Sequence, residues 1–179
     1  MSEIRNSTES VTRNNRFIYA DPDKCIGCIN CELACSASHM DADIDTVYAM
    51  IGRGEEIEPS RNKVVTIDGK TAPLQCMQCP DAPCLEACPV DIIRFEEDYV
   101  KYYESDCIGC TSCDMVCPYG AVTMATNTKP DAPVSQMVSL TCDLCGGENG
   151  KQACISICPT DAISMIDHVE FNLMMSQKG

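Results

Sequence analysis

The chain has 179 residues, of which 16 are cysteines and none is a tryptophan, and aromatic residues make up only 5%. Cysteines at about 9% are typical of a cysteine-built scaffold, whereas a large apolar core is not expected. The formal net charge of −14 argues against nucleic-acid binding, which needs clustered Lys and Arg against phosphate.

The N-terminal residues 1–15 are polar, and we expect them to form a flexible arm. They contain neither an apolar signal-peptide core nor an adjacent pair of arginines. No stretch of the chain approaches the roughly 18 apolar residues of a membrane span. We therefore expect a cytoplasmic protein without a transmembrane segment, although export as the passenger of a signal-bearing partner stays open. In a reducing compartment, clustered cysteines indicate metal binding or catalysis rather than disulfides.

Four cysteine motifs follow one another along the chain and use all sixteen cysteines. The first and third have spacers of two, two and three residues, the second of two, four and three, and the fourth of two, eight and three. Proline follows the last cysteine of every motif except the first, where serine follows. The motifs are Cys25, Cys28, Cys31 and Cys35; Cys76, Cys79, Cys84 and Cys88; Cys107, Cys110, Cys113 and Cys117; and Cys142, Cys145, Cys154 and Cys158.

These spacings favour iron–sulfur clusters over zinc and over disulfides. Zinc sites of four thiolates usually combine two separated CxxC pairs. In the bacterial ferredoxin run C-x2-C-x2-C-x3-C-P, three cysteines of one curled loop bind one cluster and the fourth binds the other cluster of the pair. The proline ends the short turn that carries the fourth cysteine, because it disfavours helical backbone at the residue before it.

The segments between the motifs predict which motifs form a pair. Ile92–Phe95 and Tyr99–Tyr103 predict a β-hairpin between motifs two and three, which would make these two motifs one unit. Motifs one and four are then left to pair. The β-prone segments Phe17–Asp21 and Ala162–Ile166 flank these two motifs, and we expect them to lie side by side.

The predicted fold class is α+β, with two pseudo-twofold bacterial 2×[4Fe-4S] ferredoxin-like units, one inserted in the other. Small β-hairpins and short helices are expected around the clusters. Unit A would comprise residues 16–75 and 126–166, and unit B residues 76–125. The arm of residues 1–15 precedes them, and the tail of residues 167–179 follows.

Exchange of the fourth cysteine between paired motifs predicts four [4Fe-4S] clusters with sixteen cysteine ligands. Site one would use Cys25, Cys28, Cys31 and Cys158; site two Cys142, Cys145, Cys154 and Cys35; site three Cys76, Cys79, Cys84 and Cys117; and site four Cys107, Cys110, Cys113 and Cys88. Because each site already has four thiolates, His39 is not expected to bind iron. The isoleucines between the ligands are expected to pack against the clusters, namely Ile26, Ile29, Ile108, Ile155 and Ile157.

The segments outside the motifs leave alternatives open. The long stretch 36–75 contains a predicted strand at Lys63–Ile67 and would form a surface loop, cover one face of the first unit or meet a partner. Residues 146–150 predict a flexible turn. In the tail, Val169 and Leu173 recur near helical spacing. The tail would either fold back on its own subunit or dock on a neighbouring subunit, which leaves a homo-oligomer or a filament open.

The motifs "CIGCINCELAC", "CMQCPDAPCLEACP", "CIGCTSCDMVCPYGA" and "CDLC…CISICPTDAI" resemble a known family over residues 16–166. It comprises the four-cluster ferredoxin-like electron-transfer subunits of formate dehydrogenases, hydrogenases and dimethyl sulfoxide reductases. The segment "NRFIYADPDKCIGC" is most similar to the cytoplasmic formate dehydrogenase and hydrogenase subunits, including those of formate hydrogenlyase and hydrogen-dependent carbon dioxide reductase. The resemblance implies the same pairing of motifs.

The resemblance further implies an electron-transfer subunit that is not itself an enzyme. It would relay single electrons between a catalytic molybdenum or tungsten enzyme, a hydrogenase, or both, and other iron–sulfur subunits. A tungsten aldehyde oxidoreductase or a carbon monoxide dehydrogenase is the alternative partner. The alternative of another class is a zinc-stabilised interaction module. No GxGxxG or phosphate-binding loop supports flavin or nicotinamide binding.

Overall fold

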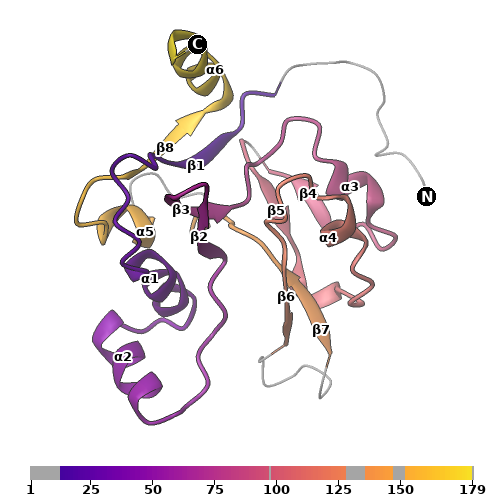
Figure 1. The fold of residues 1–179 in the computed structure, drawn as a ribbon. Helices are drawn as coiled ribbons and strands as arrows, with labels where there is room; N and C mark the ends of the chain where they lie inside the picture. Colours follow the sequence, from indigo (N-terminus) through magenta and orange to yellow (C-terminus); the bar gives the residue numbers. More distant parts are fainter. Residues whose placement is uncertain (1–12, 97, 128–135, 147–151, 179) are drawn as a thin grey trace.

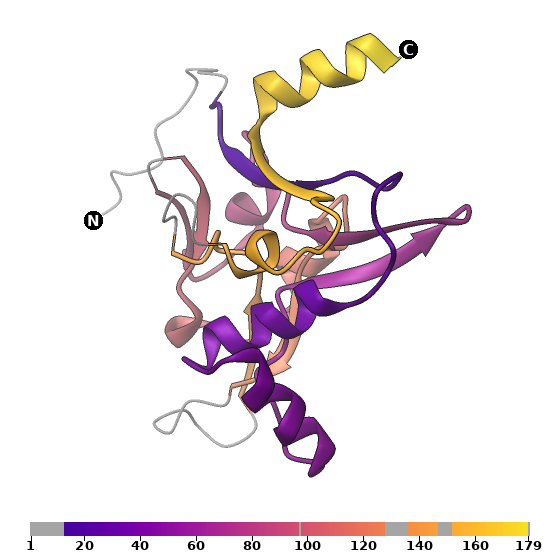
Figure 2. The ribbon, with the colours of Figure 1, turned by 90° about the vertical axis from the view of Figure 1, so that its left-hand side faces the viewer.

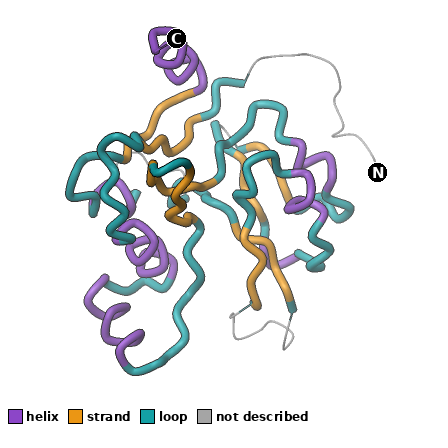
Figure 3. Tube along the Cα trace, viewed as in Figure 1, coloured by secondary structure: helices purple, strands orange, loops and turns teal. Residues whose placement is uncertain are grey.

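The computed structural model describes residues 13–96, 98–127, 136–146 and 152–178. Short helices and four two-stranded antiparallel sheets are joined by long loops (Figure 3). Most of the predicted arm and of the turn at 146–150 lies outside the described residues. Within the described ranges, no helix combines the length and the apolar character that a membrane crossing requires.

The first sheet joins the two ends of the chain. Strand β1 (Arg16–Ala20) pairs antiparallel with β8 (Ile163–Asp167), which confirms that the segments flanking motifs one and four lie side by side (Figure 1). Ile18 and Ile163 are buried in one apolar cluster together with Leu144 of motif four. This cluster also contains cysteines of motifs one and four, so the sheet holds these two motifs together.

Residues 93–140 contribute two further two-stranded sheets. The predicted hairpin between motifs two and three is present as β4 (Ile93–Phe95) and β5 (Val100–Tyr102), followed by the 3-10 turn η1 (Glu104–Asp106). Strand β6 (Thr123–Thr126) pairs with β7 (Met137–Leu140).

Strand β7 lies in the sequence range predicted for unit A, but it packs with unit B. Its Val138 and Leu140 are buried in one core with Ile93 and Val100 of the β4–β5 hairpin. The division into two units stays a prediction. If it holds, this packing places the end of unit B after Leu140 rather than after residue 125.

Four short helices carry the third cysteine of each motif. They are α1 (Asn30–His39), α3 (Pro83–Ala87), α4 (Ser112–Val116) and α5 (Ala153–Ser156). The helices of the three motifs that end in Cys-Pro have only four or five residues, whereas α1, which lacks the proline, has ten. This difference is expected because proline disfavours helical backbone at the preceding residue.

The long segment between motifs one and two is ordered. It contains α2 (Ile44–Gly52) and a hairpin of β2 (Asn62–Ile67) and β3 (Lys70–Gln75), which includes the predicted strand. Asp43 caps α2 by accepting a hydrogen bond from the backbone N–H of Thr46 at 2.7 Å. The segment therefore covers unit A rather than forming a plain surface loop.

The tail forms helix α6 (His168–Lys178), which projects from the body of the molecule (Figures 1 and 2). Its Phe171 packs edge-on against Phe17, with ring centroids 5.5 Å apart. Leu173 and Met175 are more than half exposed. The tail thus folds back on its own chain through its first turns and leaves apolar side chains uncovered further along.

Candidate iron–sulfur cluster sites

The loops of motifs one and three have the same backbone. Gly27 and Ile29 have φ angles of +69° and +59°, and Gly109 and Thr111 have +67° and +64°. Left-handed backbone at two alternate positions curls the chain so that the first three cysteines of the motif can face one point. At Gly109 a Cβ atom would lie 2.8 Å from the carbonyl oxygen of Met137, so only glycine fits.

The same hydrogen bond follows the fourth cysteine in motifs three and four. The backbone N–H of Ala121 donates to the sulfur of Cys117 at 3.4 Å, and that of Ala162 to Cys158 at 3.3 Å. The donor is four residues after the cysteine in both cases. Such N–H···S bonds are among the protein's means of setting the reduction potential of an iron–sulfur cluster.

The cysteines predicted for site one line one cavity. Cys25, Cys28 and Cys31 of motif one face Cys158 of motif four, with Val64 of β2 closing one side. Burial raises the pKa of Cys31 to about 12. The side chain of Cys28, in contrast, is exposed at the surface. Site one therefore has a buried wall and an open side.

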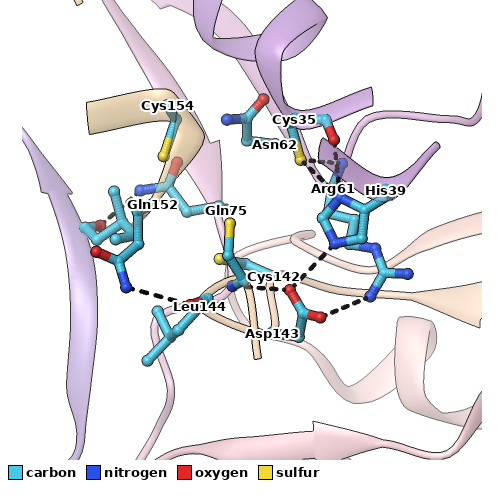
Figure 4. Close-up of a pocket in the computed structure, with 12 residues that line it drawn as sticks. Cys35, His39, Arg61, Asn62, Gln75, Cys142, Asp143, Leu144, Gln152 and Cys154 are labelled. Carbon is cyan, nitrogen blue, oxygen red and sulfur yellow. Dashed lines mark hydrogen bonds and ion pairs between the residues drawn. The ribbon is translucent and has the colours of Figure 1, made fainter. Parts of the chain in front are cut away.

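The cysteines predicted for site two line a second cavity (Figure 4). Cys142, Cys145 and Cys154 of motif four meet Cys35 of helix α1 there. Burial raises the pKa of Cys154 to about 12, and the neighbouring thiols of Cys35 and Cys145 act in the same direction. Burial also raises the pKa of Cys142 far above its usual value.

The cysteines predicted for site three lie close together as well. Burial, together with the nearby thiols of Cys84, Cys79 and Cys117, raises the pKa of Cys76 to about 12. Cys117 belongs to motif three, so cysteines of two motifs meet at this site. Helices α3 and α4, which carry motifs two and three, pack against each other.

At site four, the structure brings the predicted cysteines into one apolar core. Cys107 and Cys113 of motif three are buried there, and Cys88 of motif two packs against the same core. The fourth predicted ligand, Cys110, is exposed. Site four thus has an open side at its second cysteine, as site one has at Cys28.

The donor set suits an iron–sulfur cluster. Sulfur atoms of two motifs line each of the two cavities, and backbone N–H groups point at several of them. Among the described residues, no three Cys, His, Asp or Glu side chains form a group that would hold a single metal ion. A thiol that coordinates a metal is deprotonated despite burial, since the metal's charge reverses the local preference for the neutral form. The assignment of ligands to sites stays a prediction.

A network of charged side chains, not anticipated from the sequence, lies beside site two (Figure 4). The ring of His39 bonds the backbone oxygen of Cys35 at 2.7 Å and a carboxylate oxygen of Asp143 at 3.2 Å. Burial alone would lower the pKa of His39, but its bonds to Asp143 and Cys35 raise it to about 10. Both ring nitrogens therefore donate to oxygen atoms at neutral pH.

Arg61 extends this network from unit A to unit B. Its guanidinium group pairs with Glu104 at 2.8 Å and with Asp143 at 3.4 Å, and its backbone N–H donates to the sulfur of Cys35 at 3.3 Å. The side chains of Arg61 and Glu104 are each only 11% exposed. No sequence signal marks this pair, because the two residues are far apart in the chain: Arg61 precedes β2 and Glu104 begins the 3-10 turn η1.

The isoleucines expected to pack against the clusters are only partly covered in motifs one and three. Ile26, Ile29 and Ile108 are 66%, 49% and 60% exposed. Ile26 and Ile29 nevertheless line the cavity of site one beside its cysteines. Ile155 and Ile157 of motif four are half buried, as expected for packing beside a site.

Comparison with known proteins agrees with the cysteine geometry. Residues 75–121 and 106–162 match the family of 4Fe-4S dicluster domains. An iron-sulfur protein of Rhodospirillum rubrum is 42% identical over 164 residues, covering 87% of this chain and 84% of that protein. The electron transport protein HydN of Escherichia coli strain K12 is 32% identical over 176 residues, covering 92% and 95%. Formate hydrogenlyase subunit 2 of the same strain is 28% identical over 190 residues, covering 92% and 88%.

The fold and the cysteine-lined sites thus define an iron–sulfur protein with 4Fe-4S ferredoxin-like domains. More specifically, the chain belongs to the family of iron–sulfur electron-transport proteins that includes these relatives.

Replacing Arg61 by methionine is expected to destabilise the protein by roughly 3 kcal/mol, because a buried carboxylate then loses its ion pair. The matched control is Arg53→Met. Arg53 pairs with Glu55 at the surface, where both side chains are about half exposed, and such pairs contribute little. Thermal unfolding of the reconstituted proteins measures both changes. Equal melting temperatures for the two variants would contradict the structural role of Arg61.

Proposed function

We propose that this protein relays single electrons through four [4Fe-4S] clusters between a catalytic subunit and other redox subunits. The observation that carries the proposal is that each of two cavities is lined by three cysteines of one motif and the fourth cysteine of its partner motif. The clusters would supply the one-electron chemistry. The chain would bind them, orient them and exclude water, and no residue would act as acid, base or nucleophile.

The positions of the cysteines support a linear order of sites from one to four. Cys31 of site one and Cys35 of site two lie one turn apart on α1. Cys76 of site three lies close enough to Cys142 of site two to raise its pKa, so these two sites adjoin. Helix α3 contains Cys84 of site three, and Cys88 of site four is the C-terminal cap residue of the same helix.

The two ends of this order coincide with the most exposed cysteines of the chain. Cys28 belongs to site one and Cys110 to site four, and both are exposed. The exposed side chains of Ile26 and Ile108 belong to the residues two positions before them. An exposed ligand with an adjacent apolar side chain brings a cluster close to a partner surface. We therefore place the entry and the exit of electrons at these two ends.

The partners in this proposal are a formate dehydrogenase, a hydrogenase or both, together with further iron–sulfur subunits. The support is the similarity to formate hydrogenlyase subunit 2. A tungsten aldehyde oxidoreductase or carbon monoxide dehydrogenase is the alternative catalytic partner. The proposed location is the cytoplasm, because none of the sixteen cysteines is paired in a disulfide and a reducing compartment keeps cysteines available for metal binding.

The anaerobically reconstituted chain is expected to contain about sixteen iron atoms and as much sulfide, since each of four cubane clusters holds four of each. Metal and sulfide analysis, together with the brown colour of iron–sulfur proteins, measures this. A colourless protein rich in zinc would establish the interaction-module alternative instead, and half the expected iron would reject the four-cluster relay.

Two single substitutions test the exchange of fourth cysteines. Cys158→Ser is expected to damage the cluster bound by motif one, and Cys117→Ser the cluster bound by motif two, because each removes a ligand supplied by the partner motif. EPR spectra of the reduced variants would each lack the signal of one cluster. Loss of the signal from the substituted cysteine's own motif would show that each motif binds its cluster alone.

The exposed apolar side chains of α6 lead to a prediction about assembly. We propose that Val169, Leu173 and Met175, all more than half exposed, dock on a neighbouring subunit, in a homo-oligomer, a filament or a redox complex. Replacing the three by serine should leave the iron content intact and reduce the mass of the native assembly. Because Phe171 is retained, its packing on Phe17 is preserved. An assembly of unchanged mass would contradict docking through these side chains.

A further inference from the structure

Gln78 is a completely buried residue between the first two cysteines of motif two. Its backbone has a φ angle of +50°, a left-handed conformation that is strained for a residue with a side chain. Glycine would adopt this backbone without that strain. The contacts of its side chain must therefore explain why this position holds glutamine and not glycine.

The amide of Gln78 connects the two halves of the molecule. Its Nε2 donates to the backbone oxygen of Cys142 at 2.6 Å, and its Oε1 accepts from the backbone N–H of Val100 at 2.6 Å. Cys142 belongs to motif four and Val100 to the hairpin between motifs two and three. The amide thus donates to one predicted ferredoxin-like unit and accepts from the other.

The backbone of Gln78 has three further partners. Its N–H donates to the sulfur of Cys76 at 3.4 Å. Its carbonyl oxygen accepts from Asn15 Nδ2 at 2.9 Å and from the ring of His168 at 3.2 Å. The first and last described segments of the chain therefore fix the position of the peptide that carries the amide.

Together these bonds form a continuous bonded route between two predicted ligands of different clusters. It runs from the backbone oxygen of Cys142 across one hydrogen bond into the Gln78 amide, along that residue to its backbone N–H, and across a second hydrogen bond to the sulfur of Cys76. A methionine of similar length would make neither amide bond, and an asparagine is one methylene shorter. A glutamate provides a donor only when its carboxyl group is protonated.

We propose that Gln78 is the positioning residue that couples sites two and three, so that electrons cross between the two units through its amide. The inference rests on the proposed four-cluster relay. In this step the cluster at the site of Cys142 would lose one electron, and the cluster at the site of Cys76 would gain it. No bond breaks and no proton moves. A one-electron redox protein at one end supplies the electron, and another at the far end accepts it.

The first test is Gln78→Met, with Gln136→Met as the matched control. Gln136 also donates its amide Nε2 to the backbone oxygen of a cysteine, Cys107, at 2.5 Å, but on the β7 side of unit B alone. Flash photoreduction followed by rapid-freeze EPR measures how fast an electron redistributes among the clusters. We expect Gln78→Met to slow passage between sites two and three several-fold, with full iron content, and Gln136→Met to leave it unchanged.

The second test is Gln78→Glu, which separates coupling from a structural role. When protonated, the introduced carboxyl group can donate to the oxygen of Cys142 and accept from Val100, as the amide does. When ionised, it loses that donor and faces the carbonyl oxygen with a negative charge. Electron passage in this variant should match the wild type at acidic pH and fall as the pH rises. The wild type should show no such fall.

The outcomes separate this inference from the function on which it rests. Passage at the wild-type rate in Gln78→Met, or an equal loss in Gln136→Met, would overturn the role of Gln78 and leave the relay standing. If Gln78→Met loses iron, the pH dependence of Gln78→Glu decides, and a rate independent of pH would overturn the inference. A wild-type chain that holds fewer clusters, or passes no electrons between units, would instead reject the proposed function.

Discussion

The burial of thiols at the centre of both halves is the constraint on which the rest of the structure depends. Cys31 and Cys154 belong to one core cluster, and Cys107 and Cys113 to the other, in positions that hydrocarbon side chains fill in most proteins. Burial raises the pKa of such thiols, so their ionised form needs a metal charge beside it. Folding and cluster binding are therefore coupled, because the groups that complete each core are also the candidate ligands.

Several polar and charged contacts join the two halves. Gln78 bonds Cys142 across the boundary, Arg61 pairs with Glu104, and Arg16 pairs with Asp98 of the β4–β5 hairpin. Where such groups are buried, as Gln78 is and the Arg61 side chain largely is, they are costly unless each finds its partner, and they therefore favour one relative placement of the halves. A well-defined placement suits electron transfer, since the distance between neighbouring sites must stay constant as electrons pass.

The sequence was sufficient to predict the elements whose signals are local. The four motifs, the β4–β5 hairpin and the strand within 63–67 follow from spacing, β-propensity and turn residues, and the pairing of β1 with β8 followed from pairing the motifs. The rest depends on contacts between distant residues. Nothing in the sequence near 137–140 indicates that β7 joins unit B, because its partner β6 lies beyond a separate stretch of chain. The exposure of Ile26 and Ile108 was not predicted either, because hydrophobicity alone does not indicate which side chains of a tight turn face solvent.

The pseudo-symmetry of the motifs does not make the two ends of the molecule equivalent. Cys28 and Cys110 occupy the same position in loops of the same sequence, CIGC, and both are exposed. Their surroundings differ, however. Thr71 of β3 approaches Gly27 beside Cys28, whereas Met137 of β7 approaches Gly109 beside Cys110. Identical loops therefore present different surfaces to partners. Selectivity for a partner must arise from the segments around the loops, and the motifs themselves set only the cofactor.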